Sequence, residues 1–563
     1  MARRPDRRKR NEHSEVHGKV HGTAYGTTHE TERGTIIKEW TGRVPVCVTY
    51  PNTYFIGMSN LAVHLLYKTI NALPGVVCER VFFEEAKLGS GREPGPRSIE
   101  SRKPLDAFEL IFITISFEMD YINAANLLSL AHLGPLARER KEGDPLVVGG
   151  GICVMANPEP LAGFFDLFIM GDIEATIPAF IETYVAHHEK GRDELIEELS
   201  KPEWVYNPGH LSVSYGQDGT VAGFEPASSR VRIERYRGKH LSTSAIMTEQ
   251  TEFSNMFLVE GTRGCPSRCP FCLTGAIGPF VYDRLPSIDD SVQDVGIIGG
   301  GVSFHPALVD LIKELKARGI RPHLPSLRMD EVPLEVIELV SEEVKTLTFG
   351  IEAAAERLRR SIGKPLTDED IYERIEAIMA IKSFHLKLYF MIGLYGERME
   401  DVEKIVEMAK HIMHLMIRQG AKRGTVGSIT VHASPFVPKA ATPFQWLPMD
   451  DVSSLKEKLA VLKRGLGKAA NTYFTHESVK YSFLQGVLAR GDRRVQDVIL
   501  SLAGGVGLAK VQRESPINLN FYVTRERGAD ERFPWDFITG EKEKARLQKQ
   551  LNTVLAQLSS SKQ

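Results

Sequence analysis

The segment Glu260–Thr274 has the sequence EGTRGCPSRCPFCLT and brings three of the chain's six cysteines into eight residues. These are Cys265, Cys269 and Cys272, with three and then two residues between them. Thiolates are soft ligands that suit iron–sulfur clusters and zinc. The spacing therefore predicts a metal centre on a loop in a protein from a reducing compartment, since six cysteines in 563 residues do not indicate a disulfide framework.

Two metals are compatible with soft thiolate ligands. Structural zinc normally takes four ligands in tetrahedral geometry, and no further cysteine follows Cys272. Three thiolates can instead bind three irons of a four-iron cube, which leaves the fourth iron open for another ligand. We favour the cluster on spacing alone, with zinc or three inert thiols as alternatives.

The cysteine segment opens the second of two β/α series. Upstream, the apolar runs Val44–Tyr50, Val76–Phe83, Leu110–Ser116, Leu146–Gly149 and Asp166–Met170 alternate with amphipathic stretches. Near-continuous apolar strands separated by helices predict a parallel sheet covered on both faces, that is, a doubly wound α/β domain.

Downstream, six further strands are predicted, with helices such as Leu308–Arg318 and Asp368–Ile381 between them. This pattern suits an incomplete (β/α)6 barrel whose first helix is short. The six strands are Met256–Glu260, Val295–Ser303, Arg321–Leu327, Thr346–Ile351, Lys387–Ile392 and Gly427–Val431.

We predict five segments from these patterns. They are a disordered basic tail (1–40), the doubly wound domain (41–195), a β-rich linker with turn signals (196–255), the barrel (256–447) and a mostly helical C-terminal region (448–563). The arginine- and lysine-rich stretch Arg359–Lys364 is interpreted as a solvated helix end.

The cysteine motif directly after the first strand of a β/α series resembles the radical S-adenosylmethionine (SAM) superfamily. The resemblance covers about 255 to 445 and implies that Cys265, Cys269 and Cys272 hold a [4Fe–4S] cluster to which SAM binds. It also implies SAM contacts at strand ends, where (β/α) barrels collect active-site groups. Those positions are Gly299, Gly300, Gly301, Ser326, Arg328, Glu352, Ile392 and Gly393. An acidic residue usual after the glycines is replaced here by Val302.

The doubly wound domain ahead of the barrel resembles the cobalamin-binding domain of the B12-dependent radical SAM class. In open α/β sheets, ligands bind at the carboxyl ends of the strands. The Asp-x-His-x-x-Gly motif that supplies an axial histidine is absent, since the loop here is Pro51–Gly57 (PNTYFIG). The resemblance implies that the cobalamin candidates are Tyr54, Ser116, Glu118, Met119, Tyr121, Gly149, Gly150, Gly151, Gly171 and Asp172.

These resemblances imply a cobalamin-dependent radical SAM methyltransferase acting on an unactivated carbon of a peptide or protein. Glutamine C-methylation of methyl-coenzyme M reductase in methanogens is the specific hypothesis. One alternative is tRNA methylthiolation, which normally needs three more cysteines for a second cluster. Cys47 and Cys78 fall inside apolar strands instead. A non-catalytic cobalamin or redox sensor is the other alternative.

Composition bears on partners and location. The net charge of −2 gives no global attraction to nucleic acid or membranes, and no apolar run reaches the ~20 residues of a membrane span. We expect a cytoplasmic protein, a peptide or protein substrate, and a flavodoxin or ferredoxin as electron donor. The segment Trp535–Phe537 is a candidate cap for the barrel mouth.

Overall fold

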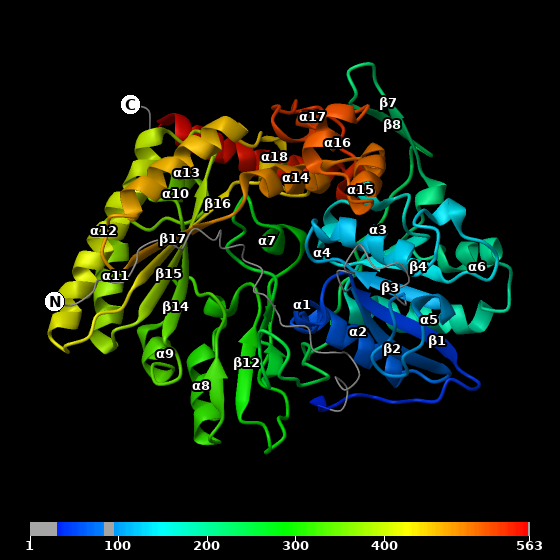
Figure 1. Ribbon diagram of the computed structural model, residues 1–563, viewed down its shortest axis with the longest axis horizontal. Helices are drawn as coiled ribbons and strands as arrows, with labels where there is room; N and C mark the ends of the chain where they lie inside the picture. The colour runs from blue at the N-terminus through cyan, green and yellow to red at the C-terminus, as the bar shows by residue number, and fades with distance from the viewer. Residues whose placement is uncertain (1–30, 84–94, 561–563) are drawn as a thin grey trace, which may run out of the picture.

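The computed structural model describes residues 31–83 and 95–560, and two β/α units lie side by side in it (Figure 1). The basic run of residues 1–10 lies outside this range. Residues 31–40 belong to the predicted tail but are ordered, because Trp40 Nε1 donates to Glu79 at 2.6 Å and the backbone NH of Ile36 donates to the Tyr67 hydroxyl at 2.8 Å. The first unit therefore begins before Val44.

The N-terminal unit is the predicted doubly wound domain. Its sheet has the order β2-β1-β3-β4-β5-β6, in which β6 alone runs antiparallel to its neighbour. Every residue of β1 is buried, as expected for a strand covered on both faces. The strands are β1 (Val44–Tyr50), β2 (Val76–Phe82), β3 (Leu110–Thr114), β4 (Leu146–Gly150), β5 (Leu167–Ile169) and β6 (Val205–Tyr206).

Helices cover both faces of this sheet. One face packs with α2 and α5 in a core of its own, and the other face belongs to a core that continues into the barrel. The helix α2 begins after Asn60, whose side chain accepts from the backbone NH of Ala62 at 3.0 Å, a normal N-cap. The helices are α1 (Tyr54–Met58), α2 (Leu61–Ala72), α3 (Asp120–Leu130), α4 (Ile152–Ala156), α5 (Ile173–His187) and α6 (Arg192–Leu199).

The linker carries an antiparallel hairpin, β7 (Ser212–Tyr215) and β8 (Val221–Glu225), that projects at the edge of the molecule (Figure 1). The rest of the linker runs along the N-terminal unit. Gly171 forms a parallel bridge with Glu234, so the chain returns over the end of β5 before it enters the barrel.

The barrel is open and its strands are parallel. One sheet has the order β13-β12-β9 and the other β14-β15-β16-β17, and a parallel bridge between Leu327 and Phe349 links them. Its strands are β9 (Phe257–Glu260), β12 (Asp294–Ile298), β13 (Arg321–His323), β14 (Thr346–Glu352), β15 (His385–Ile392), β16 (Ile429–Pro435) and β17 (Thr472–His476).

One barrel strand was missed by the sequence prediction. The strand β17 pairs parallel with β16 inside the region predicted to be helical. It is short, at the sheet edge, and half-exposed along its length, so it lacks the apolar run that marks a buried strand. The predicted strand Val295–Ser303 ends earlier, at Ile298, because the glycines leave the sheet.

Helices follow most barrel strands. The first barrel helix is short, as predicted, but it lies directly after the cysteines at Leu273–Ile277, and the stretch between Asp283 and Val295 from which a short helix was predicted holds none. The helix α11 begins with a capping box between Thr367 and Asp370. The helices are α7 (Leu273–Ile277), α8 (Leu308–Ala317), α9 (Leu334–Leu339), α10 (Glu356–Ser361), α11 (Asp368–Ile381), α12 (Met399–Ala421) and α13 (Val452–Leu466). A small hairpin, β10 (Thr262–Arg263) with β11 (Val281–Tyr282), flanks α7.

The C-terminal helices lie across the top of both units (Figure 1). The helix α15 packs on α3 of the N-terminal unit, and α18 packs on α10 of the barrel. They are α14 (Val479–Arg490), α15 (Gln496–Ala503), α16 (Leu508–Glu514), α17 (Asn520–Val523) and α18 (Asp536–Ser560, interrupted at Gly540). The C-terminal region thus connects the two units.

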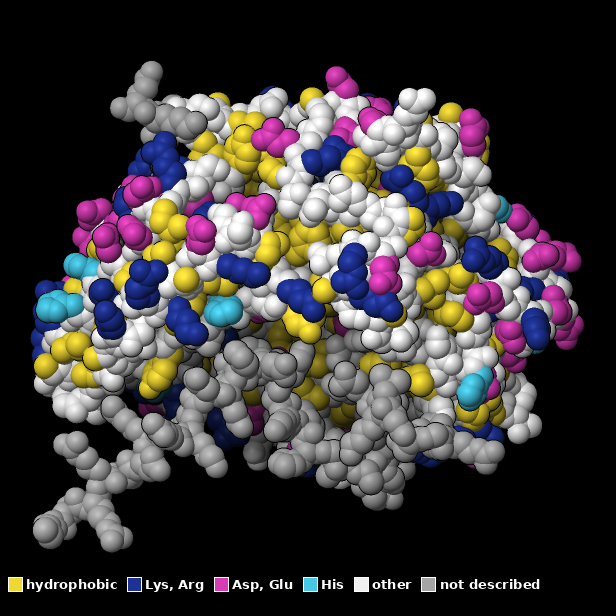
Figure 2. Space-filling view, turned by 45° about the horizontal axis from the view of Figure 1, so that its top comes forward, with side chains coloured by type: hydrophobic (Ala, Val, Ile, Leu, Met, Phe, Trp, Pro, Cys, Tyr) yellow, Lys and Arg dark blue, Asp and Glu magenta, His cyan; other side chains and the backbone are white. Residues whose placement is uncertain are grey.

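Acidic and basic side chains are interspersed over the face shown in Figure 2, in keeping with the small net charge. Among the helices of residues 31–83 and 95–560, none combines the length and the apolar character that a membrane span requires.

Candidate functional site

The three cysteines of the motif lie on the loop between β10 and α7. The loop turns at Gly264, which has φ +73°, and a Cβ there would lie 2.3 Å from the carbonyl oxygen of Pro279. The backbone NH of Cys272 donates to the carbonyl of Cys269 at 3.0 Å, and Cys272 is the N-cap of α7. Cys269 is buried, whereas Cys265 and Cys272 are half-buried, so the loop presents thiols to a partly open space.

Two cations lie beside Cys269. Burial raises the pKa of the Cys269 thiol, and the positive charges of Arg328 and Lys364 act against that rise. The Nη1 atom of Arg328 is 3.6 Å from the Cys269 sulfur. Three thiolates around iron leave a net negative charge, so these cations fit a [4Fe–4S] cluster held on this loop. Within the described residues, no group of three His, Cys, Asp or Glu side chains, the three cysteines of this loop included, is already gathered around one point.

The glycine loop after β12 lies against the cysteine loop. Gly299 has φ +144°, and a Cβ there would lie 2.2 Å from the carbonyl oxygen of Thr262. The backbone NH of Gly301 donates to the Thr262 hydroxyl at 3.3 Å. A side chain on Gly300 would collide with Thr274, two residues after Cys272. Glycine is required here because two loops approach at backbone distance.

A cavity of about 360 Å³ opens at the carboxyl ends of β12, β13 and β14. It brings together Gly300, Gly301, Ser326, Arg328 and Glu352, which were predicted from separate strand ends. Gly299 lies beneath, packed on Thr262. The complete lining is Gly300, Gly301, Val302, Ser303, Phe304, Ser326, Leu327, Arg328, Gly350, Glu352, Lys364 and Tyr389.

The acidic group of this cavity is held in a strained conformation. Glu352 has φ +67°, a region that non-glycine residues rarely adopt. Its carboxylate pairs with the Lys364 ammonium at 2.9 Å, and the same ammonium donates to the carbonyl of Gly350. Backbone strain of this kind persists where the surrounding contacts enforce it, and it collects at ligand sites.

Lys364 and Tyr389 are among the lining residues that sequence reasoning missed. Lys364 belongs to the stretch interpreted as a solvated helix end, but it is buried against Glu352, and Arg359 is fully buried with its guanidinium on Asp368 at 2.6 Å. Tyr389 points into the cavity from β15. Period-2 alternation along β15 could have indicated Tyr389, because half-buried Lys387 and Tyr389 alternate with buried Leu388 and Phe390.

Two predicted SAM contacts do not reach the cavity. Ile392 is fully buried. Gly393 is covered by α13, since a Cβ there would lie 2.7 Å from Leu455 and 2.9 Å from Asp450. The C-terminal region therefore closes over the end of β15.

The glycines at the edge of the N-terminal sheet have different surroundings. Gly151 has φ +109°, and a Cβ there would lie 2.3 Å from the carbonyl oxygen of Ile115. Gly149 is packed under Phe168, whereas the nearest atom to a Cβ on Gly150 would be 3.8 Å away. Gly171 is crowded by Glu234 of the returning linker. Among these glycines, Gly150 alone would accept a Cβ without a clash, since its nearest neighbour is the Ile169 carbonyl oxygen at 3.8 Å.

Most polar candidates of this edge already have protein partners. The Tyr54 hydroxyl donates to Glu32, and both Tyr54 and Tyr121 are buried. Glu118 accepts from Lys439 at 2.6 Å and from Gln485 at 2.9 Å. Asp172 accepts from the backbone NH of Tyr236 at 2.9 Å and pairs with Arg235. Met119 is half-buried against the core.

Two apolar side chains are exposed near the carboxyl ends of β1 and β3. Ser116 accepts from Asn60 Nδ2 at 2.9 Å, and the neighbouring Phe117 is 46% exposed. Ile56, in the short helix α1 after β1, is 42% exposed. Strand order reverses between β1 and β3, and ligands of doubly wound sheets bind at such a reversal. Phe117 and Ile56 are the apolar side chains that sequence reasoning did not single out.

Two family models match the chain. Residues 62–208 match the family described as radical SAM proteins, N-terminal, and residues 259–409 match the radical SAM superfamily. The second match contains the cysteine loop, the glycine loop and the cavity. The chain belongs to the radical SAM superfamily. Members of this superfamily are enzymes that use a [4Fe–4S] cluster and SAM, so both are implied for this chain.

Relatives extend over much of the radical SAM chain. An uncharacterised protein of Methanocaldococcus jannaschii is 28% identical over 473 residues, which cover 80% of this chain and 89% of the relative. An uncharacterised methyltransferase of Pyrococcus horikoshii is 25% identical over 239 residues, which cover 39% of this chain and 50% of the relative.

Solved structures of radical SAM enzymes show only distant similarity. The cobalamin-dependent SAM radical enzyme OxsB, with aqua-cobalamin bound, aligns over 92% of this chain and 80% of its own, at 11% identity and a TM-score of 0.44. Streptococcus suis SuiB, bound to S-adenosylmethionine, aligns over 40% of this chain and 52% of its own, at 12% identity and a TM-score of 0.28. With TM-scores below 0.5, neither similarity carries an inference about ligands.

Proposed function

We propose that this radical SAM enzyme transfers a methyl group from cobalamin to an unactivated carbon of a peptide or protein. The observation that carries the proposal is the packing of the two units. The helix α4, which follows the glycines of the N-terminal sheet, contacts α7, which follows the cluster cysteines. A ligand at that sheet edge would lie on the cluster side of the barrel.

The chain's own residues prepare the cavity for SAM. The backbone of Gly300 and Gly301 leaves room for a ligand close to the cysteine loop, and Glu352 offers a carboxylate to an ammonium group. Arg328 bridges the cavity and Cys269, and Lys364 fixes the Glu352 carboxylate. When bound, the cluster and SAM supply a 5′-deoxyadenosyl radical that removes a hydrogen atom, and cobalamin supplies the methyl group.

Features of the N-terminal edge fit cobalamin in part. Exposed Phe117 and Ile56 at the strand-order reversal suit the apolar face of a corrin, and a Cβ on Gly150, at the end of β4, would meet no atom closer than 3.8 Å. Tyr54 and Tyr121 do not suit a role toward cobalt, because both side chains are buried. The relation to an uncharacterised methyltransferase supports methyl transfer over other radical reactions.

The proposal also names a substrate class. The mixed charge of the face in Figure 2 does not favour nucleic acid, so we propose a peptide or protein, with glutamine C-methylation of methyl-coenzyme M reductase as the first reaction to test. Cluster reduction needs one electron from outside, for which we propose a flavodoxin or ferredoxin.

The test is anaerobic reconstitution with iron, sulfide and hydroxocobalamin, followed by metal analysis and absorption spectra. The proposal expects four irons and one cobalt per chain, roughly the full loading of both sites. SAM and a glutamine peptide would then give 5′-deoxyadenosine, S-adenosylhomocysteine and a methylated peptide. Iron without cobalt would contradict the cobalamin step while leaving the radical SAM assignment intact.

A second candidate is a radical SAM reaction in which the N-terminal unit is a scaffold. It is favoured by Glu118, Asp172 and Tyr54, whose polar groups are bound within the protein. Methylthiolation in particular would need further cluster ligands. Cys47, Cys78 and Cys153 are buried, and burial raises the pKa of each thiol well above its usual value.

A further inference from the structure

The cluster loop is fastened to a segment outside its own strands. Pro270 lies between Cys269 and Cys272, and its carbonyl accepts from the backbone NH of Phe444 at 3.1 Å. Phe444 belongs to η7, a short 3₁₀ helix (Pro443–Trp446) that follows the strand β16. A backbone hydrogen bond therefore couples η7 directly to the loop that carries the cysteines.

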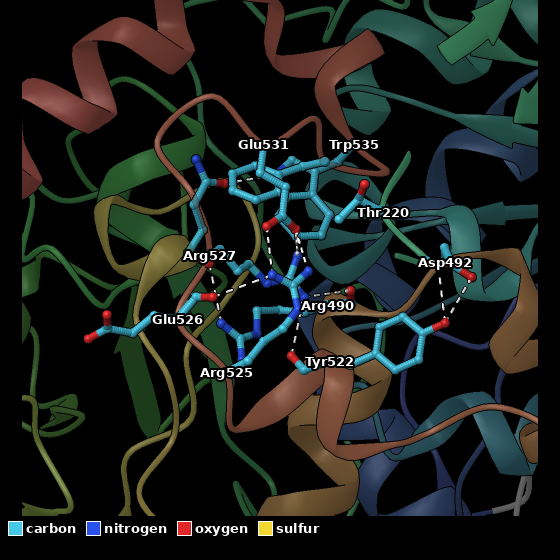
Figure 3. Close-up of polar contacts among 12 residues, drawn as sticks. Thr220, Arg490, Asp492, Tyr522, Arg525, Glu526, Arg527, Glu531 and Trp535 are labelled. Carbon is cyan, nitrogen blue, oxygen red and sulfur yellow. Dashed lines mark hydrogen bonds and ion pairs between the residues drawn. The ribbon is translucent and has the colours of Figure 1, made fainter. Parts of the chain in front are cut away.

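A fully buried arginine binds η7 and the residue that follows it. Arg490 is the last residue of α14 and is fully buried. Figure 3 shows Arg490 among Arg525, Arg527 and Tyr522. The Arg490 guanidinium donates to the carbonyl oxygens of Leu447 at 2.7 Å, Val523 at 2.7 Å and Gln445 at 3.3 Å. These carbonyls come from two segments far apart in the sequence, and the planar fork of arginine suits them because it offers several donors in fixed directions.

The neighbours of Arg490 stabilise the same segment. The Gln445 side-chain oxygen accepts from Trp535 Nε1 at 2.7 Å and from the backbone NH of Ala441 at 3.0 Å. The backbone NH of Arg527 donates to the carbonyl of Trp446 at 3.1 Å. With Arg490, these contacts hold η7 on both sides, so the predicted cap residue Trp535 supports η7 and does not line the SAM cavity.

The charge of Arg490 is not needed for an ion pair. Among the described residues no carboxylate hydrogen-bonds to it, and Glu531 pairs with Arg525 at 2.6 Å. Burial, and then the positive charges of Arg527 and Arg525, lower the pKa of Arg490 well below its usual value. A buried cation that bonds only to carbonyls is costly, which indicates that the geometry of its donors is what the site requires.

The end of α14 is also held from the N-terminal unit. Asn157, which ends α4, donates from Nδ2 to the carbonyls of Gly491 at 2.8 Å and Ala489 at 3.2 Å, the two neighbours of Arg490. Gln485, earlier on α14, donates to Glu118 at 2.9 Å. A continuous set of contacts thus runs from the N-terminal unit through Arg490 and η7 to the cluster loop.

We propose that Arg490 is a positioning residue for the [4Fe–4S] cluster, and that it acts through η7 on the loop that carries Cys269 and Cys272. The proposal rests on the radical SAM site and not on cobalamin or methyl transfer. Its failure is therefore distinguishable from failure of the proposed function.

The test compares Arg490→Met with Arg525→Met. Methionine keeps much of the apolar stem at position 490 and removes the donors. Arg525 lies in the same group of polar contacts but is 28% exposed, and it bonds to Glu531 and not to residues 443–449. After anaerobic reconstitution, iron release to a chelator is followed in both variants together with the EPR spectrum of the reduced cluster, with and without SAM.

The expected result is iron release about tenfold faster in Arg490→Met, which corresponds to losing roughly 1.4 kcal/mol of loop stabilisation, and an altered EPR response to SAM. Arg490→Lys should give an intermediate rate, and Arg525→Met should match the wild type. Wild-type iron release and EPR in folded Arg490→Met would overturn the proposal. Failure of both position-490 variants to fold would also overturn it, because Arg490 would then serve folding alone.

Discussion

The two β/α units each present glycines and polar groups at the carboxyl ends of parallel strands, yet the two edges differ. At the barrel edge, Glu352, Lys364 and Arg328 line a cavity, and the charges of the two cations act on Cys269. At the N-terminal edge, Glu118 and Asp172 are bound by residues from other segments. Glu352 and Arg328 are also paired, with Lys364 and Asp330, but both line an open cavity, whereas the pairs at the N-terminal edge join separate segments of the protein.

The carboxyl end of a strand can therefore bind a ligand only where no other segment of the chain packs over it. The linker covers Gly171, and Lys439 and Gln485 reach Glu118. Over the barrel, α13 covers Gly393 but leaves Ser326 and Glu352 open. The following variants test whether both edges bind ligands or only one does.

The largest expected effect is at the cysteine loop. Cys269→Ala should abolish cluster assembly and SAM cleavage, because three thiolates are the minimum set on this loop. Iron per chain and 5′-deoxyadenosine formation measure it. Cys78→Ala, which alters a buried thiol of the N-terminal core, should keep both, and deoxyadenosine formation by Cys269→Ala would refute the cluster assignment.

Burial of Asp120 at the N-terminal edge should make the free energy of unfolding depend on pH. Burial raises its pKa to about 6, despite hydrogen bonds from Asn52, Tyr50 and Asn123, and Glu118 adds to the rise. The unfolded value is about 3.9, so the native state binds the proton more tightly. Stability should therefore fall as pH rises from about 4 to about 6, by up to about 3 kcal/mol.

Urea unfolding at several pH values measures this dependence, and Asp120→Asn should remove it. Asp106→Asn, at an exposed position of the same unit, is the matched control. An unchanged slope in Asp120→Asn would show that another group titrates.

Glu352 tests the barrel edge. Glu352→Gln keeps the shape and removes the charge that an ammonium group of SAM would meet, so SAM should bind about 30-fold more weakly, or roughly 2 kcal/mol. Equilibrium binding of SAM to the reconstituted protein measures it. Glu331→Gln, at an exposed position after β13, should bind SAM normally. Equal affinity of both variants for SAM would show that the SAM ammonium group does not contact Glu352.

The smallest expected effects distinguish the roles of two adjacent glycines, Gly150 and Gly151. Gly150→Phe places a bulky side chain at the N-terminal edge, where a Cβ would meet no atom closer than 3.8 Å, so cobalt retention should fall about tenfold, or roughly 1.4 kcal/mol, with iron and thermal stability unchanged. Gly151→Ala should instead lower the melting temperature, because φ is +109° there and the Cβ meets Ile115. Normal cobalt retention in Gly150→Phe would favour the scaffold alternative.

Periodicity predicted most of the fold. Buried strands such as β1 and β3 have long apolar runs, and α11 has both its amphipathic pattern and its cap at Thr367. The strand β17 was missed because an exposed edge strand has no apolar run. Ordered residues 31–40 were missed because their partners, such as Glu79, are distant in sequence.

The local spacing of Cys265, Cys269 and Cys272 determined the metal chemistry without any tertiary information, because cluster ligands on one loop are neighbours in the chain. The sequence also determined which residues end strands, and hence the pool of candidates. Only the tertiary structure decided which candidates meet. Lys364 joins Glu352, α13 covers Gly393, and Arg490 supports the cluster loop through η7. These are contacts between segments far apart in the chain, and no local pattern encodes which segment packs over a strand end.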